Sequence, residues 1–361
     1  MIRQKLAPFT LSDKLGRICV MNRRIFLSHA LGFTASAAGL ALAGTAGRSL
    51  ASQAQAHRIL ELELFDAERR RPVPARLYLP RRASASKPVP LAVFSHGLGG
   101  SRMGYSYLGS HWADEGIASL HPQHVGSDNA LWRGNPLEMV QRLQSAAGES
   151  EAQARALDLR FALDQVLKSD QARVIDPSKI AVAGHSYGAN TAMLISGALV
   201  TTAGGDLVDL RDKRIRAAIL ISAPPFVGQG PIEQVLEAVS IPTLHVTSLG
   251  DTINLPGYRS SVEDRIRIFH AMNQSTKTLA VFNTGGHSIF TDRITSSGPD
   301  TSARIKAATR ELCTIFLKRS LTQQHPMTTE DTSQWLLRHE GLLDRLVMPQ
   351  TASAIRNSNR G

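Results

Sequence analysis

The chain has 361 residues, of which 42% are hydrophobic and 20% are charged, and this composition excludes an intrinsically disordered protein. The formal net charge is +11, but residues 1–56 carry +6 of it and the remainder only +5. A protein that binds nucleic acid keeps its basic surface in the folded part, so this distribution argues against a nucleic-acid partner.

Residues 1–56 have the composition of a leader. From Met21 to Ala56 the segment has a basic start, an apolar stretch of small residues and an Ala-Gln-Ala end, which is typical of a signal peptide. Arg23 and Arg24, followed by Ile-Phe-Leu, resemble a bacterial twin-arginine export signal. We expect translation to start at Met21, cleavage to follow Ala56, and the mature protein to be periplasmic or secreted. The apolar stretch is short for a membrane span, so we expect no stable span after cleavage, with an uncleaved anchor as the alternative.

Residues 57–319 predict strands that alternate with helices. The strands are expected at Ile59–Phe65, Ala75–Pro80, Leu91–Ser95, Gly116–Pro122, Lys179–Gly184, Ile215–Ser222, Ile241–Ser248 and Lys277–Asn283. The helices are expected at about residues 105–115, 149–168, 187–199, 231–239, 258–272 and 302–318. The first two strands alternate apolar and polar residues and suit an antiparallel edge. The later strands are continuous apolar runs, which indicate a parallel sheet covered by helices on both faces.

This order predicts one α/β domain over residues 57–319, followed by a helical and polar tail over residues 320–361. Residues 127–148 and 201–213 are expected to be insertions that could wall a pocket. Cys313 lies in an apolar helical run and is expected to be buried. Cys19 falls in the leader, so the mature chain has one cysteine and neither an intrachain disulfide nor a cysteine-based metal site is expected.

The stretch Gly184-His185-Ser186-Tyr187-Gly188 fits the pattern G-x-S-x-G. This pattern is weak alone, but here it follows a buried strand and opens a helical segment, which is the context that a nucleophilic serine requires. The glycines are needed because a side chain at either position would crowd the neighbouring strand or helix. We therefore predict that Ser186 is the nucleophile, and a structural turn is the alternative.

A serine hydroxyl needs a base, and in this arrangement an acid and then a histidine follow the serine along the chain. Asp251 comes just after one predicted strand, and His287 follows the next one after two glycines. We predict that His287 takes the proton from Ser186 and that Asp251 orients the imidazole. Asp264 falls inside a helical pattern and is expected on its solvated face, and Asp292 follows His287 in the wrong order.

The oxyanion that forms during acyl transfer needs two backbone donors. One is predicted to be the N–H of Tyr187, the residue after the nucleophile. The other should come from the stretch Phe-Ser-His-Gly-Leu-Gly-Gly-Ser after an earlier strand, with Leu98 as the donor and Gly99 as the alternative. His96 precedes this loop and is expected to orient it rather than to act as the base.

His121 and His124 are spaced by three positions, but Pro122 breaks any helix between them and further ligands are not evident. We therefore interpret the pair as structural or pocket-lining and expect no metal. Tyr105, Trp112 and Trp132 could line an apolar cleft or belong to the core.

The run from Phe94 to Asp128, with Ala-Gly-His-Ser-Tyr-Gly-Ala-Asn-Thr-Ala and Asn-Thr-Gly-Gly-His-Ser, resembles the α/β-hydrolase superfamily. Within it, the chain resembles the predicted dienelactone hydrolase group, which is related to platelet-activating-factor acetylhydrolases, chlorophyllases and polyester hydrolases. The resemblance covers about Ile59 to Arg319. It implies a mostly parallel eight-stranded sheet with helices on both faces, a Ser-His-Asp triad, no cofactor, and hydrolysis of carboxylic esters that often carry short acyl groups.

The leading hypothesis is thus an exported serine hydrolase that acts on a small-molecule ester through an acyl-enzyme. An amidase, thioesterase or lactonase would use the same triad and is the first alternative. A non-catalytic binding protein on a hydrolase fold is the second. The sequence does not determine the oligomeric state.

Overall fold

The computed structural model describes residues 56–349 except residues 256, 257, 274, 294, 324, 326 and 340. The predicted leader therefore lies, up to residue 55, outside the described residues. Among the helices that are described, none has the length and apolar character needed to cross a membrane.

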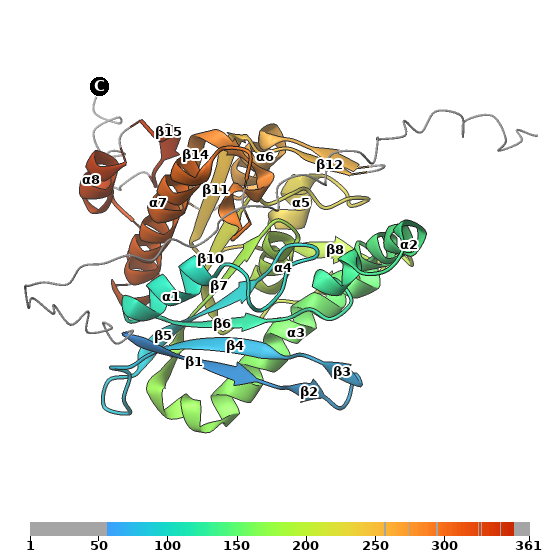
Figure 1. The fold of residues 1–361 in the computed structure, drawn as a ribbon, viewed down its shortest axis with the longest axis horizontal. Coiled ribbons are helices and arrows are strands. Elements are labelled where there is room, and N and C mark those ends of the chain that lie inside the picture. The colour runs from blue at the N-terminus through green and yellow to red at the C-terminus, as the bar shows by residue number, and fades with distance from the viewer. Residues whose placement is uncertain are drawn as a thin grey trace, which may run out of the picture. The chain divides into compact units, whose positions relative to one another are not determined.

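A nine-stranded sheet is the central feature of the described chain (Figure 1). In spatial order its strands are β1 (His57–Leu62), β4 (Ala75–Pro80), β6 (Ala118–Pro122), β5 (Val89–Ser95), β7 (Ile175–His185), β10 (Ile215–Ile221), β11 (Thr243–Gly250), β14 (Lys277–Gly286) and β15 (Leu343–Val347). The strands from β6 to β14 in this order are parallel, and β1, β4 and β15 add antiparallel pairings at the two edges. This mostly parallel sheet is the α/β-hydrolase arrangement expected from the sequence.

Helices cover both faces of the sheet. They are α1 (Ser106–Asp114), α2 (Pro136–Ala146), α3 (Glu149–Lys168), α4 (Tyr187–Ser196), α5 (Ile232–Leu236), α6 (Val262–Ala271), α7 (Pro299–Leu317) and α8 (Thr329–Arg338). Successive residues of β5 show the division: Leu91 and Val93 pack with α3 and α4, whereas Ala92 and Phe94 pack with α1 and α7. Side chains of a strand alternate between faces, so a continuous apolar run supplies two cores at once.

Short strands and single helical turns lie in the segments that connect the main strands and helices. Three two-stranded pairs are formed by β2 (Phe65–Asp66) with β3 (Arg71–Pro72), β8 (Leu199–Thr201) with β9 (Leu207–Asp209), and β12 (Ile253–Leu255) with β13 (Tyr258–Ser260). Single turns are η1 (Asn129–Trp132), η2 (Asp170–Val174), η3 (His287–Phe290) and the π-helical η4 (Lys318–Gln323). The predicted insertion at residues 127–148 therefore contains η1 and α2.

The prediction of eight strands is wrong by one. The ninth strand, β15, lies in the tail that was predicted to be helical and polar, where it pairs antiparallel with β14. Its leucines, Leu343 and Leu346, pack against the core on the α7 side, whereas Asp344 and Arg345 between them are exposed. The predicted helix at residues 258–272 begins only at Val262, because Ser261 and Asp264 form a capping box that starts α6 there. Cys313 is fully buried, as expected.

Trp335 of α8 packs the tail against the core. Its side chain is fully buried, and its indole N–H donates to the carbonyl of Ala308 on α7 at 2.9 Å. We expect Trp335→Ala to lower the free energy of unfolding by about 3–5 kcal/mol, because it leaves a large cavity in the core. Urea denaturation would measure this. Leu337→Ala, on the same helix but with a side chain 70% exposed, is the matched control and should change little.

Candidate active site

Ser186 occupies a strained turn between β7 and α4. Its φ of 55° and ψ of −125° lie in a region that non-glycine residues rarely adopt, which lifts the side chain out of the turn. A Cβ added at Gly184 would lie 2.1 Å from the carbonyl oxygen of Gly188, and one at Gly188 would lie 2.0 Å from that of Ser95. Both glycines are therefore required by contact with backbone, for the reason that the sequence suggested.

The structure brings Ser186, His287 and Asp251 together from the ends of three strands. Nε2 of His287 lies 2.8 Å from Oγ of Ser186, and Nδ1 lies 2.7 Å from Oδ1 of Asp251. An ionised carboxylate only accepts hydrogen bonds, so we assign the imidazole proton to Nδ1. Nε2 is then the acceptor for the proton of the serine hydroxyl.

Two further contacts bring the loop of His287 close to the acid. The hydroxyl of Ser248 donates to the carbonyl oxygen of Gly285 at 2.7 Å. A Cβ added at Gly250 would lie 2.7 Å from the same oxygen. The end of β11 and the end of β14 thus touch through backbone, which sets the separation of Asp251 from His287.

Asp251 is fully buried and ionised. Burial raises the pKa of its carboxyl group, but the hydrogen bond and charge of His287 and the charge of Arg265 outweigh burial and hold the pKa well below its usual range. The guanidinium Nε of Arg265 lies 3.5 Å from Oδ2, which also accepts a hydrogen bond from Thr247 at 2.7 Å. Arg265 is itself buried on α6. No sequence signal distinguished it from Arg267, the exposed arginine of the same helix.

The competing carboxylates are engaged elsewhere. Asp264 accepts from the backbone N–H of Ser261 at 3.0 Å as the N3 residue of the α6 capping box, rather than lying free on a solvated face. Asp292 accepts from the backbone N–H of Ser106 at 2.9 Å. Neither forms a hydrogen bond with His287 in the part of the chain that is described.

The loop after β5 runs beside Ser186, since a Cβ added at Gly97 would lie 3.3 Å from the Cβ of Ser186. The N–H of Gly99, the alternative donor, already donates to the carbonyl of Ser127 at 2.8 Å. The backbone N–H groups of Leu98 and Tyr187 have no hydrogen-bond partner among the described residues. This difference favours Leu98 over Gly99 as the second donor.

His96 is tied to the loop that it precedes. Its Nδ1 donates to the carbonyl oxygen of Gly97 at 2.8 Å, and its Nε2 accepts from the backbone N–H of His124 at 3.0 Å. Burial, with the charge of Arg155 as a further cause, lowers its pKa well below the ordinary value, so the ring stays neutral. These contacts fit the loop-orienting role expected for His96.

His185, inside the serine motif, was not singled out by the sequence. Its Nδ1 lies 2.8 Å from the hydroxyl of Tyr105, and its Nε2 lies 3.0 Å from the carbonyl oxygen of His287. Burial and the neighbouring His287 lower the pKa of His185 to about 3, so it is neutral and donates from Nε2. It thereby holds the backbone of His287 beside Ser186.

The two histidines spaced by three are each bonded to other groups. His121 bonds the hydroxyl of Ser119 at 2.8 Å. His124 bonds Ser95 at 2.9 Å and the carboxylate of Asp158 at 3.1 Å. Within residues 56–349, as far as they are described, the side chains that bind metals form no group of three.

The aromatic residues divide between the two interpretations. Tyr105 and Trp112 are buried in the core. Trp132 of η1 is 44% exposed, and its indole N–H donates to the carbonyl of Gly99 at 2.9 Å. The insertion at residues 127–148 therefore covers one side of the loop that carries Leu98.

A match to a known family supports the interpretation of this site. Residues 50–132 match the family model described as platelet-activating factor acetylhydrolase, isoform II. No curated protein matches the chain. The matched residues include the loop from His96 to Gly100 but precede Ser186, Asp251 and His287. Together with the mostly parallel sheet, the match confirms the resemblance to the acetylhydrolase-like group of α/β-hydrolases.

The turn at Ser186 depends on the absence of a side chain at Gly188. We expect Gly188→Ala to displace α4 from the end of β5, because the new Cβ would meet the carbonyl of Ser95 at 2.0 Å. The melting temperature and the hydrolytic rate on a nitrophenyl ester should both fall. Gly230→Ala is the control, since its nearest neighbour would lie 3.6 Å away. A Gly188→Ala protein with unchanged melting temperature and rate would contradict this account of the turn.

Proposed function

We propose that the chain is an exported serine hydrolase that cleaves carboxylic esters of small molecules through an acyl-enzyme. One observation carries the proposal: a single imidazole, that of His287, is bonded to Oγ of Ser186 at 2.8 Å and to the buried carboxylate of Asp251 at 2.7 Å. A base within reach of a serine hydroxyl, itself oriented by a carboxylate, is the arrangement that activates a serine.

The proposed reaction has two halves. In the first, His287 takes the proton of Ser186 as Oγ attacks the ester carbonyl, and then gives that proton to the departing alcohol. In the second, His287 takes a proton from water, the hydroxide attacks the acyl group, and Ser186 recovers its proton as the acid leaves. The N–H groups of Leu98 and Tyr187 would hold the oxyanion in both halves, aided by the N-terminus of α4.

The acyl group is proposed to be short. The support is the matched family, whose description names an acetylhydrolase, and Trp132, which covers the loop of Leu98. Amides, thioesters and lactones would pass through the same tetrahedral intermediate, so the triad does not separate them from esters. Export of the protein is proposed from the leader.

The first test is a fluorophosphonate probe, which reacts with serines that have a working base. We expect purified protein starting at His57 to be labelled stoichiometrically, and peptide mass spectrometry to locate the label at Ser186. Ser186→Ala should abolish labelling and turnover without changing the circular dichroism spectrum. Absence of labelling in the folded wild-type protein would instead favour the binding-protein alternative. Labelled protein can then be compared on nitrophenyl esters of increasing acyl length.

The acid is tested by a pair of matched substitutions. Asp251→Asn should lower kcat by about 10⁴-fold, because the amide favours the wrong tautomer of His287. Asp264→Asn should leave kcat within a few-fold of wild type, since the amide oxygen of asparagine can still accept from the backbone N–H of Ser261. Initial-rate kinetics on one ester measure both variants. The reverse result would transfer the role of the acid to Asp264.

A further inference from the structure

We propose that Arg155 of α3 is a positioning residue that holds in register the two segments bearing the oxyanion donors. This inference rests on the proposed function, because it concerns the geometry of the N–H groups of Leu98 and Tyr187. The sequence does not single out Arg155, and the family match ends before it.

Arg155 is fully buried, yet every nitrogen of its guanidinium has a hydrogen-bond partner. Nη2 donates to the carbonyl oxygen of His96 and, at 3.1 Å, to the hydroxyl of Ser95. Nη1 donates to the hydroxyl of Ser127 at 2.7 Å, and Nε donates to that of Thr191 at 3.0 Å. One rigid fork thus joins the end of β5, the insertion and α4.

These partners lie next to the proposed oxyanion donors on both sides. His96 is two residues before Leu98, and the backbone carbonyl of Ser127 accepts a hydrogen bond from the N–H of Gly99. On the other side, Thr191 lies one turn after Tyr187 on α4, and the guanidinium carbon of Arg155 lies 4.5 Å from the centre of the Tyr187 ring. A shift of Arg155 would therefore change the separation of the two donor segments.

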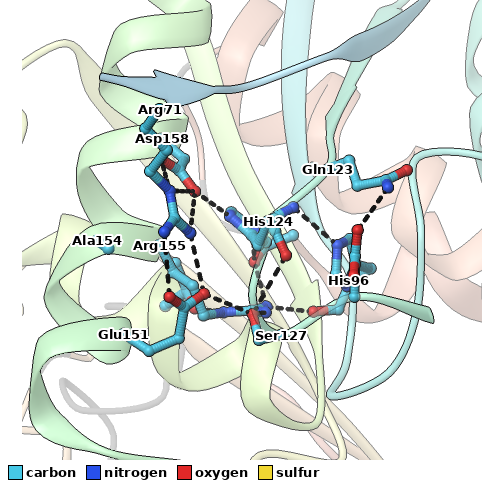
Figure 2. Close-up of polar contacts among 12 residues, drawn as sticks. Arg71, His96, Gln123, His124, Ser127, Glu151, Ala154, Arg155 and Asp158 are labelled. Atoms are coloured by element: carbon cyan, nitrogen blue, oxygen red, sulfur yellow. Dashed lines mark hydrogen bonds and ion pairs between the residues drawn. The ribbon is translucent and has the colours of Figure 1, made fainter. Parts of the chain in front are cut away.

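The carboxylates that balance the positive charge of Arg155 are linked to it through neutral side chains. Ser95, which accepts a hydrogen bond from Arg155, is hydrogen-bonded to His124. His124 is in turn hydrogen-bonded to the buried carboxylate of Asp158 (Figure 2). Glu151 reaches the network through the hydroxyl of Ser127 at 2.8 Å.

Arg71 then bonds both of these carboxylates, Glu151 at 3.0 Å and Asp158 at 3.0 Å, as Figure 2 also shows. The four hydrogen bonds of the Arg155 guanidinium, by contrast, all go to neutral oxygens. Burial lowers the pKa of Arg155 to about 10, which leaves it charged at neutral pH.

A role in stability alone does not account for this arrangement. Replacing a buried cation and its partners by apolar side chains often leaves stability unchanged or improves it. Lysine offers a single nitrogen and cannot reproduce four contacts in the plane of one fork. The geometry points instead to a role in which Arg155 fixes the distance between the loop of Leu98 and the start of α4.

The test compares Arg155→Lys and Arg155→Met with two controls. Arg69→Gln removes another arginine that bonds Asp158 but touches neither donor segment. Trp335→Ala lowers stability at a distance from the site. For each protein we would measure kcat and KM on a nitrophenyl ester and on the matching thionoester, together with urea denaturation. Sulfur accepts hydrogen bonds poorly, so the ratio of the two kcat/KM values reports on the oxyanion donors.

We expect Arg155→Lys and Arg155→Met to lower kcat on the ester by roughly 10- to 100-fold with little change in KM, because the loss is confined to the transition state. The preference for ester over thionoester should fall with kcat. Both controls should keep the wild-type preference, whatever their stability. A folded Arg155→Met protein with the wild-type kcat and preference would overturn the inference.

Smaller substitutions keep the inference testable if the Arg155 variants do not fold. Ser127→Ala and Thr191→Val each remove one partner of the guanidinium, and each should lower kcat and the ester preference by roughly 3- to 10-fold. Wild-type values in both would overturn the inference. Fluorophosphonate labelling of wild-type Ser186 distinguishes failure of the proposed function from failure of the role of Arg155. If the wild-type protein is not labelled, the proposed function fails. If it is labelled and the variants keep the wild-type kcat and preference, only the role of Arg155 is rejected.

Discussion

The contact between Gly188 and the end of β5 is the constraint on which the candidate site depends. Because Gly188 has no Cβ, the first turn of α4 can lie directly against the carbonyl of Ser95. That approach places Ser186 at the tip of a strained turn and the loop of Gly97 beside it. A larger residue at Gly188 would separate the nucleophile from the loop proposed to hold the oxyanion.

The parallel sheet supplies the rest of the arrangement. Carboxyl ends of parallel strands lie along one edge, and ligand sites of open α/β sheets form there. Ser186 follows β7, Asp251 follows β11 and His287 follows β14, so residues distant in sequence reach hydrogen-bond distance without any long connection. The backbone contact between Gly250 and Gly285 then sets the distance from acid to histidine.

Two buried arginines flank this edge, and they act on different parts of it. Arg265 lies beside Asp251 and helps to keep that buried carboxylate ionised. Arg155 lies beneath the loop of Leu98 and the start of α4. Buried charges are costly unless they are bonded, so their presence at these two places indicates a demand beyond packing.

The sequence by itself determined the alternation of strands and helices, the glycines around Ser186 and the chain order of Ser186, Asp251 and His287, because these depend on local periodicity and steric fit. Only the tertiary structure favours Leu98 over Gly99 as the second donor, since the carbonyl that accepts the Gly99 N–H belongs to Ser127. It alone added β15, whose short half-exposed segment becomes a strand through pairing with β14. It alone assigned partners to Arg155, because the hydrogen bonds of a buried side chain join segments far apart in the chain and leave no periodic pattern in it.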